Sequence, residues 1–174
     1  MGTPESIRKE LINTYPALQP LEEKLQRSYE LLVDCYDKGG TVLCCGNGGS
    51  AADSEHIVGE LMKSFLLPRP LRGEIAERFQ AANHGQKLAK ALQDPLPAIS
   101  LVSHSALLSA YANDVDPDMV YAQQVLGYGK NQPILLIAMS TSGNSRNVVL
   151  AAQVASILGM PTIAITGASG GALV

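Results

Sequence analysis

The sequence predicts an α/β protein in which a mostly parallel, doubly wound sheet lies between two layers of helices, preceded by long N-terminal helices. Short apolar segments alternate with amphipathic ones from residue 41 onward, which is the pattern of parallel strands joined by helical crossovers. Residues 133–139, PILLIAM, are apolar throughout, as expected of a central strand buried on both faces. Three predicted strands also end in loops of small and hydroxyl-bearing residues, where such sheets bind ligands.

Composition narrows the functional classes. The chain has 174 residues, of which 46% are hydrophobic, enough for one domain with a sizeable core. A net charge of −3 without a long basic tract gives nucleic-acid binding no electrostatic support. The N-terminus lacks a signal peptide's apolar centre, and no apolar run approaches the ~20 residues of a membrane span. We therefore expect a cytoplasmic protein. Of Cys35, Cys44 and Cys45, the two in the first strand, Cys44 and Cys45, are expected to be free buried thiols, the alternative being metal ligands or disulfide bridges.

Residues 1–40 form a predicted helical unit that precedes the main domain at 41–174. Helical patterns occur at 5–15 and 18–38, and Gly39-Gly40 ends the second. A minimal doubly wound unit has no need of a long amphipathic helix before its first strand. We predict that this helix packs on another subunit, the alternative being a helix folded onto its own domain.

The segment TVLCCGNGGSAADSEHIVGE, residues 41–60, combines a strand at 41–45, a loop at 46–50 and the start of a helix. Glycines in the loop permit positive φ angles and the close approach of a ligand. The helix points its unpaired N–H groups and its positive dipole end at the loop. This arrangement predicts an anion site, with phosphate as the anion.

The same loop also satisfies a looser dinucleotide-binding pattern, Gly46-x-Gly48-x-x-Ala51. That pattern requires an acidic residue about 20 positions further on, at the end of the second strand, to hold a ribose. The next predicted strand instead ends in Val102-Ser103-His104, and the loop has no P-loop lysine. These two features argue against a nucleotide ligand.

Residues 66–97, which separate the first two strands, are polar and contain four prolines. We predict an excursion with one or two short helices, because the segment is too short for a core of its own. After a strand at 98–102, helices are predicted at 103–111 and 118–127. The break between these helices contains Asn113-Asp114, which fits either a turn or a residue pair near the ligand cleft.

Four hydroxyl side chains follow the strand at 133–139. They are Ser140, Thr141, Ser142 and Ser145. Together with backbone N–H groups, such hydroxyls can hold a dianionic phosphate without a lysine. The alternative is that they cap the helix predicted at 147–158, but one cap needs only one hydroxyl. A strand at 162–166 and a small loop at 167–171 complete the alternating pattern.

His56 and Glu60 stand four residues apart on the helix after the first loop, so they share one face, about a turn above the loop. Such a pair facing a phosphate site is expected to bind a metal or to transfer a proton. We therefore expect the phosphate loop, the imidazole and the carboxylate to lie close together. His104 could line the same cleft, whereas His84 is expected in solvent.

Two stretches together resemble a known family. GNGGSAADSEHIVGEL (46–61) and STSGNSRNVVLAA (140–152) are similar to the sugar isomerase (SIS) domain and, within it, to the sedoheptulose-7-phosphate (phosphoheptose) isomerases. The resemblance runs from about residue 15 to the end. It implies a five-stranded parallel sheet, a homotetramer with active sites between subunits, and aldose–ketose isomerisation of a sugar phosphate through an enediol.

The resemblance also implies roles for individual residues. The phosphate would be held by Ser140, Thr141, Ser142 and Ser145. The sugar site would be lined by Asn47, Gly48, Gly49 and Ser50, with Asp114 at a position that contacts substrate. Glu60 matches the carboxylate that moves a proton between C1 and C2, and His56 and Glu60 match two ligands of a zinc ion. Because zinc binding would lower the basicity of Glu60, its two roles compete, and the sequence leaves both open.

In the family, the other zinc ligands and a catalytic histidine lie on a C-terminal helix with a Gln…His pattern. The sequence ends at Val174, before such a helix and before a fifth strand, so we expect it to be C-terminally truncated. The alternative function is a non-catalytic SIS protein that binds a phosphosugar or a protein partner such as a replication initiator. The presence of His56 and Glu60 favours the isomerase.

Overall fold

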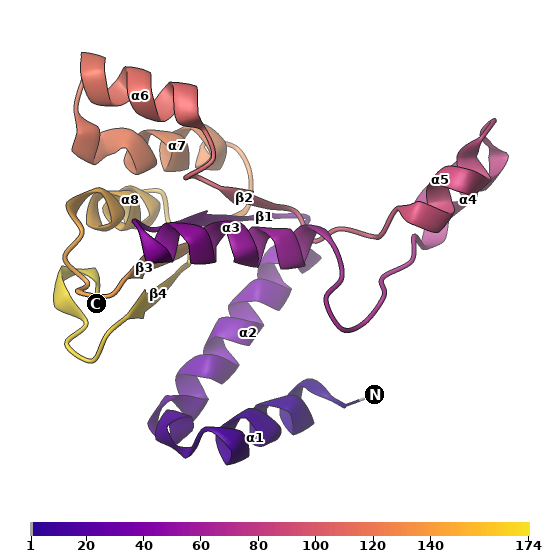
Figure 1. Cartoon of the computed structure of the whole chain (residues 1–174), viewed down its shortest axis with the longest axis horizontal. Coiled ribbons are helices and arrows are strands. Elements are labelled where there is room, and N and C mark those ends of the chain that lie inside the picture. Colours follow the sequence, from indigo (N-terminus) through magenta and orange to yellow (C-terminus); the bar gives the residue numbers. More distant parts are fainter. Residues whose placement is uncertain (1) are drawn as a thin grey trace.

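The computed structural model describes residues 2–174 and has the predicted three-layer α/β architecture (Figure 1). Its strands form one sheet in the order β2-β1-β3-β4, and all the pairings are parallel. The strands are β1 (Thr41–Cys45), β2 (Ala98–Ser100), β3 (Ile134–Ser140) and β4 (Thr162–Thr166). Because β2 lies on one side of β1 and β3 on the other, the winding direction changes between β1 and β3, as in a doubly wound sheet.

The two central strands are buried on both faces. Along β1, Leu43 and Cys45 point into one core, whereas Val42 and Cys44 point into the other. β3 alternates in the same way, and every one of its residues is buried. All three cysteines are free and buried, as predicted for Cys44 and Cys45, and burial raises the pKa of these two to about 12. These thiols are therefore neutral packing groups at physiological pH.

Helices cover both faces of the sheet (Figure 1). One face carries α6 (Ser105–Asp114), α7 (Val120–Gly129) and α8 (Arg146–Ile157), with side chains such as Val125 and Val148 in the core. The other face carries α2 (Glu22–Asp37) and α3 (Gly49–Met62), which contribute residues such as Leu32 and Ile57. Each helix thus buries the apolar stripe that its sequence pattern predicts.

The N-terminal segment differs from its prediction at one point. Helix α1 (Pro4–Thr14) matches the predicted helix at 5–15, but the predicted helix at 18–38 is wrong at its start. A 3-10 helix, η1 (Pro16–Leu21), occupies that stretch and contains Pro20. Proline lacks a backbone donor and resists incorporation into an α-helix interior, so α2 begins only at Glu22. Figure 1 shows α2 extending away from the sheet, with α1 folded back beneath it.

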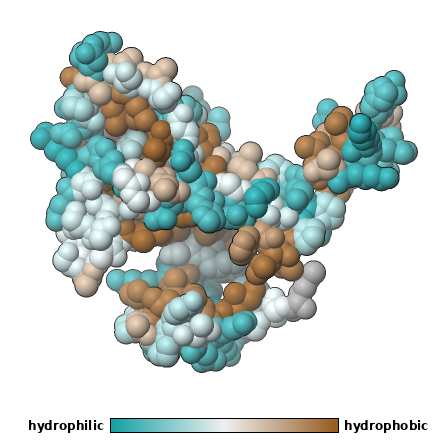
Figure 2. Space-filling model, viewed as in Figure 1, coloured by the Kyte–Doolittle hydropathy of each residue, from teal (hydrophilic) through white to brown (hydrophobic). Residues whose placement is uncertain are grey.

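The excursion at 66–97 contains two short helices, as predicted, and they form an arm that projects from the body (Figure 1). We use "the arm" for α4 (Gly73–Ala81), α5 (Gly85–Ala91) and the segments that connect them to the body. All residues of α4 and α5 are described, and among them only Gly85 is buried. Figure 2 shows apolar side chains gathered on the side of the arm that faces the body.

Some of the predicted boundaries near the sheet are wrong. β2 ends at Ser100 instead of residue 102, because the chain turns there. α6 continues through the predicted break to Asp114, since Ala112 packs against the core, and η2 (Pro117–Met119) follows it before α7. A short η3 (Gly171–Leu173) follows the last loop. Within residues 2–174, no helix has the length and apolar character needed to cross a membrane.

Candidate phosphosugar site

Two loops meet at the carboxyl edge of the sheet, where its winding direction changes. Residues 46–48 connect β1 to α3, and residues 141–145 connect β3 to α8. β1 and β3 are direct neighbours, with Cys45 opposite Ala138 near their ends. Ligands of open α/β sheets bind at this position. The structure therefore brings together the two loops that the sequence singled out independently.

The first loop depends on glycine for its shape. Gly48, the N-cap residue of α3, has φ 56°, and a Cβ on Gly46 would lie 2.6 Å from the Ser50 carbonyl oxygen. The backbone closes through Ser50 N–H to the Asn47 carbonyl at 3.1 Å and Ala51 N–H to the Gly48 carbonyl at 3.1 Å. The N-terminus of α3 thus starts directly at the sheet edge, where its dipole favours an anion.

The second loop is organised around one buried hydroxyl. Ser140 is 3% exposed, and its Oγ donates to Ser145 Oγ at 2.9 Å and accepts from the Ser145 amide at 3.3 Å. Thr141 and Ser142 are exposed. Ser145 is the N-cap residue of α8, yet its side chain makes no capping bond within residues 2–174. Ser140 supports the loop from below and holds the half-buried Ser145, while Thr141 and Ser142 lie at the surface.

A third loop supports the second. The Gly167 amide donates to the Thr141 carbonyl at 2.9 Å, and the Ala172 amide donates to Asn144 Oδ1 at 3.0 Å. Gly143 has φ 68°, and a Cβ there would lie 1.8 Å from the Gly170 carbonyl oxygen. The loop after β4 therefore fixes the second loop, residues 141–145, from the side, and this contact requires a glycine at position 143. We call this second loop the serine-rich loop.

Two asparagines join the first loop to α8. Asn47 Nδ2 donates to Asn147 Oδ1 at 2.8 Å, and Asn147 Nδ2 donates back to Asn47 Oδ1 at 3.0 Å. Tyr121 of α7, 5% exposed, donates from its hydroxyl to the Gly46 carbonyl at 2.8 Å and contacts Asn47 Oδ1 at 3.3 Å. The sequence patterns did not single out Asn147 or Tyr121. They lie 100 and 74 positions after Asn47, respectively, and no local pattern links residues that far apart.

Asp114 occupies the last position of α6 and is exposed. Its carboxylate accepts a hydrogen bond from Asn113 Nδ2 at 2.8 Å. The chain then turns toward the second loop, where the Asp118 carboxylate pairs with Arg146 Nε at 3.2 Å on the first residue of α8. Asp114 is thus connected to the loop region through η2, and Arg146 adds a cation that the sequence patterns did not single out.

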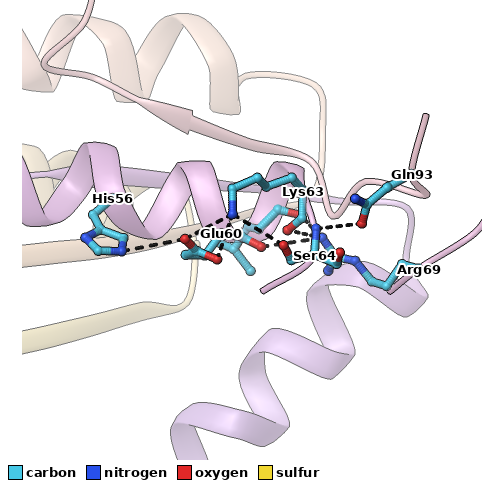
Figure 3. A network of polar contacts seen from close by, with 7 residues as sticks. His56, Glu60, Lys63, Ser64, Arg69 and Gln93 are labelled. Carbon is cyan, nitrogen blue, oxygen red and sulfur yellow. Dashed lines mark hydrogen bonds and ion pairs between the residues drawn. The ribbon is translucent and has the colours of Figure 1, made fainter. Parts of the chain in front are cut away.

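His56 and Glu60 share a face of α3, as predicted, with His56 Nε2 3.6 Å from Glu60 Oε1 (Figure 3). Lys63 Nζ lies 3.3 Å from each oxygen of the same carboxylate. The Glu60 side chain is 29% exposed and that of His56 73% exposed. A half-buried carboxylate therefore sits between an imidazole and an ammonium group, with one side open to solvent.

His56 and Glu60 were predicted to lie about one helical turn from the loop at 46–50, and within one subunit this is wrong. Glu60 follows Gly49, the first residue of α3, by eleven positions, which corresponds to roughly 16 Å along the helix axis. An extended seven-carbon chain with its phosphate spans on the order of 10 Å. The carboxylate is thus about three turns from the loop of its own subunit, because the helix runs away from the sheet edge.

His56 and Glu60 can contribute two ligands to a metal ion. Imidazole nitrogen and carboxylate oxygen are both common zinc ligands, and their 3.6 Å separation lets them reach one ion. A structural zinc site has four ligands and a catalytic one usually three from protein. Among residues 2–174 no group of three or more His, Cys, Asp and Glu side chains is arranged to hold a metal. The pair therefore fits as part of a ligand set.

Comparison with family models identifies one family. The model for the SIS domain matches residues 10–93 and 88–167. The two matched segments overlap at residues 88–93, in the second half of α5 and just after it, so the match includes the arm.

Individual proteins give a consistent result. The chain is 34% identical over 169 residues to a phosphoheptose isomerase of Shewanella sp. (strain ANA-3), covering 97% of this chain and 73% of that protein. It is 35% identical over 157 residues to the phosphoheptose isomerase of Shewanella loihica, covering 90% and 67%. Among solved structures, phosphoheptose isomerases from Neisseria gonorrhoeae and Francisella tularensis match with TM-scores of 0.68 and 0.70, at 30% and 28% identity. These matches cover 97% and 99% of this chain and 77% and 80% of those structures.

Proposed function

This chain belongs to the SIS domain family, among the phosphoheptose isomerases, and we propose that it interconverts sedoheptulose 7-phosphate and D-glycero-D-manno-heptose 7-phosphate. The observation that carries the proposal is the pair of loops at the β1–β3 edge, together with a carboxylate on the helix that starts there. The family relationship supports the reaction class, aldose–ketose isomerisation. The site's chemistry supports a phosphorylated sugar as the substrate.

In this proposal the phosphate binds at the serine-rich loop. Thr141, Ser142 and Ser145 supply hydroxyl donors, and Ser140 holds Ser145 in place. The N-terminus of α8 adds a favourable dipole for the dianion. The sugar extends along the first loop past Asn47, Gly48, Gly49 and Ser50, and Asp114 contacts it from the other side.

Glu60 acts as the general base in this scheme. From the ketose, its carboxylate removes a proton from C1 while O2 gains a proton, which gives the 1,2-enediol. A proton then returns to C2 and the proton on O1 leaves, so that the carbonyl moves to C1. No external oxidant or reductant is needed, because C1 is oxidised as C2 is reduced. His56 and Lys63, which contact the Glu60 carboxylate, hold it in position.

We propose that the complete site lies between subunits of a homotetramer, with Glu60 of one subunit facing the loops of another. Support comes from the roughly 16 Å that separate Glu60 from its own loop. It also comes from unpaired apolar side chains on the N-terminal helices, where Ile7 is 54% and Tyr29 44% exposed beside a groove of about 320 Å³. Light scattering should return four times the chain mass of 18.4 kDa, whereas a monomer at micromolar concentration would contradict the assembly.

His56 and Glu60 are the residues proposed to bind zinc, with the remaining ligands coming from outside this pair. When bound, the ion would polarise the substrate carbonyl. Zinc ligation would also lower the basicity of Glu60. Measuring deuterium exchange at C1 of the sugar after chelation and again after zinc addition therefore separates its role as a metal ligand from its role as a base. The proposal includes a cytoplasmic location, supported by three free, buried thiols.

The test is deuterium incorporation at C1 of sedoheptulose 7-phosphate in heavy water. Glu60→Gln keeps the shape of the side chain but removes the base, so exchange should slow by about 10²–10⁴-fold while phosphate affinity stays unchanged. Glu77→Gln, which removes the same charge from an exposed position on α4, is the matched control. Wild-type exchange in Glu60→Gln would refute the base assignment. No exchange in the unmutated protein would instead favour a non-catalytic phosphosugar-binding or partner-binding protein.

A further inference from the structure

The end of α3 that carries Glu60 is closed partly by a side chain from outside the helix. Lys63 follows the helix in an extended conformation, φ −123° and ψ 164°, so the helix lacks the left-handed glycine that commonly satisfies its last carbonyls. Donors come from the Leu96 amide, which lies 3.0 Å from the Leu61 carbonyl oxygen, and from Arg69. Its Nη2 lies 2.5 Å from the Leu61 carbonyl oxygen, 2.8 Å from that of Lys63 and 3.5 Å from that of Glu60. Figure 3 shows this guanidinium beside the last turn of the helix.

The environment of Arg69 indicates that backbone closure is its main role. Its side chain makes no ion pair with a carboxylate of residues 2–174, and its Nε is buried without an acceptor in that range. Desolvating a cation without an anionic partner is costly. The compensation available here is the negative end of the α3 dipole and the three carbonyls. All three contacts come from one nitrogen, Nη2, so a lysine ammonium at this position can reproduce only part of them if its shorter side chain reaches the helix end.

The same residue belongs to the base of the arm. The Asp94 amide donates to the Arg69 carbonyl at 2.7 Å, and Pro70 and Gln93 form an antiparallel bridge. Gln93 Oε1 accepts the Ser64 amide at 3.0 Å, just beyond the helix end. Both segments of the arm's base therefore bond to the end of α3 or to the residue just beyond it, although residues 69 and 93 are far apart in sequence.

We propose that Arg69 is a positioning residue for Glu60. It clamps the last turn of α3 to the base of the arm and thereby fixes the carboxylate relative to the reacting carbons. The proposal rests on the proposed function for the role of Glu60. The clamp has no contact with the phosphate loops, so loss of Arg69 should change the chemical step and leave substrate binding intact. A displacement of about 1 Å in a catalytic group can cost on the order of 10²-fold in rate.

The experiment compares Arg69→Met, Arg69→Lys and Arg72→Met in the full chain. Arg72 is an exposed cation three residues further along, so its variant controls for lost charge at the arm. Arg69→Met should lower kcat by about 10–100-fold with KM within about twofold of wild type. Arg69→Lys should recover part of the loss, and Arg72→Met should behave as wild type.

A second readout needs no substrate. Amide hydrogen exchange at residues 60–64 should accelerate at least tenfold in Arg69→Met, with residues 46–50 unchanged, because the opening is local. If the unmutated protein does not isomerise the sugar, the proposed function fails while amide exchange still decides the clamp. If Arg69→Met does not fold, the kinetics and the amide hydrogen exchange are both measured on Arg69→Lys. Unchanged kcat and protection in the Arg69 variants, or an equal loss in Arg72→Met, would overturn the proposal.

Discussion

The two ends of helix α3 are built in different ways. At the N-terminal end, backbone groups and glycines form the loop, and its contacts run to neighbouring loops at the edge of the sheet. At the C-terminal end, charged side chains cluster around Glu60, and the closing group, Arg69, comes from a projecting arm (Figure 3). One end depends on backbone shape and the other on the placement of long side chains. An anion needs fixed N–H donors, whereas proton transfer needs one well-placed group.

Glycine substitutions should show this difference most strongly. Gly143→Ala, at φ 68° and with the Gly170 carbonyl oxygen 1.8 Å from the new Cβ, should lower the free energy of unfolding by roughly 2–4 kcal/mol. Gly59→Ala, near the other end of α3, meets no atom within 4 Å and should raise it by up to about 1 kcal/mol. Denaturant titrations at one protein concentration give both values. Equal effects would show that the serine-rich loop does not need its glycine.

Removing hydroxyls should weaken binding at the loop end without affecting the carboxylate end. In the double variant Ser142→Ala and Ser145→Ala, sugar-phosphate affinity should fall by about 1–3 kcal/mol, because charge-assisted hydrogen bonds are lost. Glu60→Gln should leave that affinity unchanged. Calorimetry with the substrate measures both. Full affinity in the double variant would place the phosphate elsewhere.

The smallest expected change in stability concerns the loop after β1, residues 46–48, which Tyr121 supports from α7. Tyr121→Phe removes a buried hydroxyl that donates to the Gly46 carbonyl, so the free energy of unfolding should fall by about 1–2 kcal/mol at pH 7. Burial, with a contribution from Cys45, raises the pKa of Tyr121 from 10.0 to about 12.

This shift also predicts a pH dependence. The neutral phenol is favoured in the folded state, so its stabilising contribution is complete below about pH 10 and is lost as the pH rises toward about 12. The stability difference between wild type and Tyr121→Phe should shrink across that interval. A difference that stays constant across that interval would mean that Tyr121 has the same pKa in the folded and unfolded states.

The sequence predicted the fold because its strands are decided locally. Both ends of β1 and of β4 lie at the predicted residues, and both ends of β3 lie within one residue of the prediction. Short apolar runs bounded by glycine or proline leave few other positions at which a strand can begin or end. The two loops were also recognisable, because small and hydroxyl residues after a buried strand have a defined chemical use. Their meeting at one edge followed from the parallel topology.

Tertiary structure decided the rest. The Asn47–Asn147 pair and the Tyr121 contact join residues 74 to 100 positions apart, which no local pattern encodes. The helical spacing of His56 and Glu60 placed them on one face, but the direction of α3 carried them about three turns from the loop. Closure of that helix by Arg69 depends on where the arm returns to the body. Local sequence determines which elements form and which residues share a face, whereas distances between sites depend on how those elements pack.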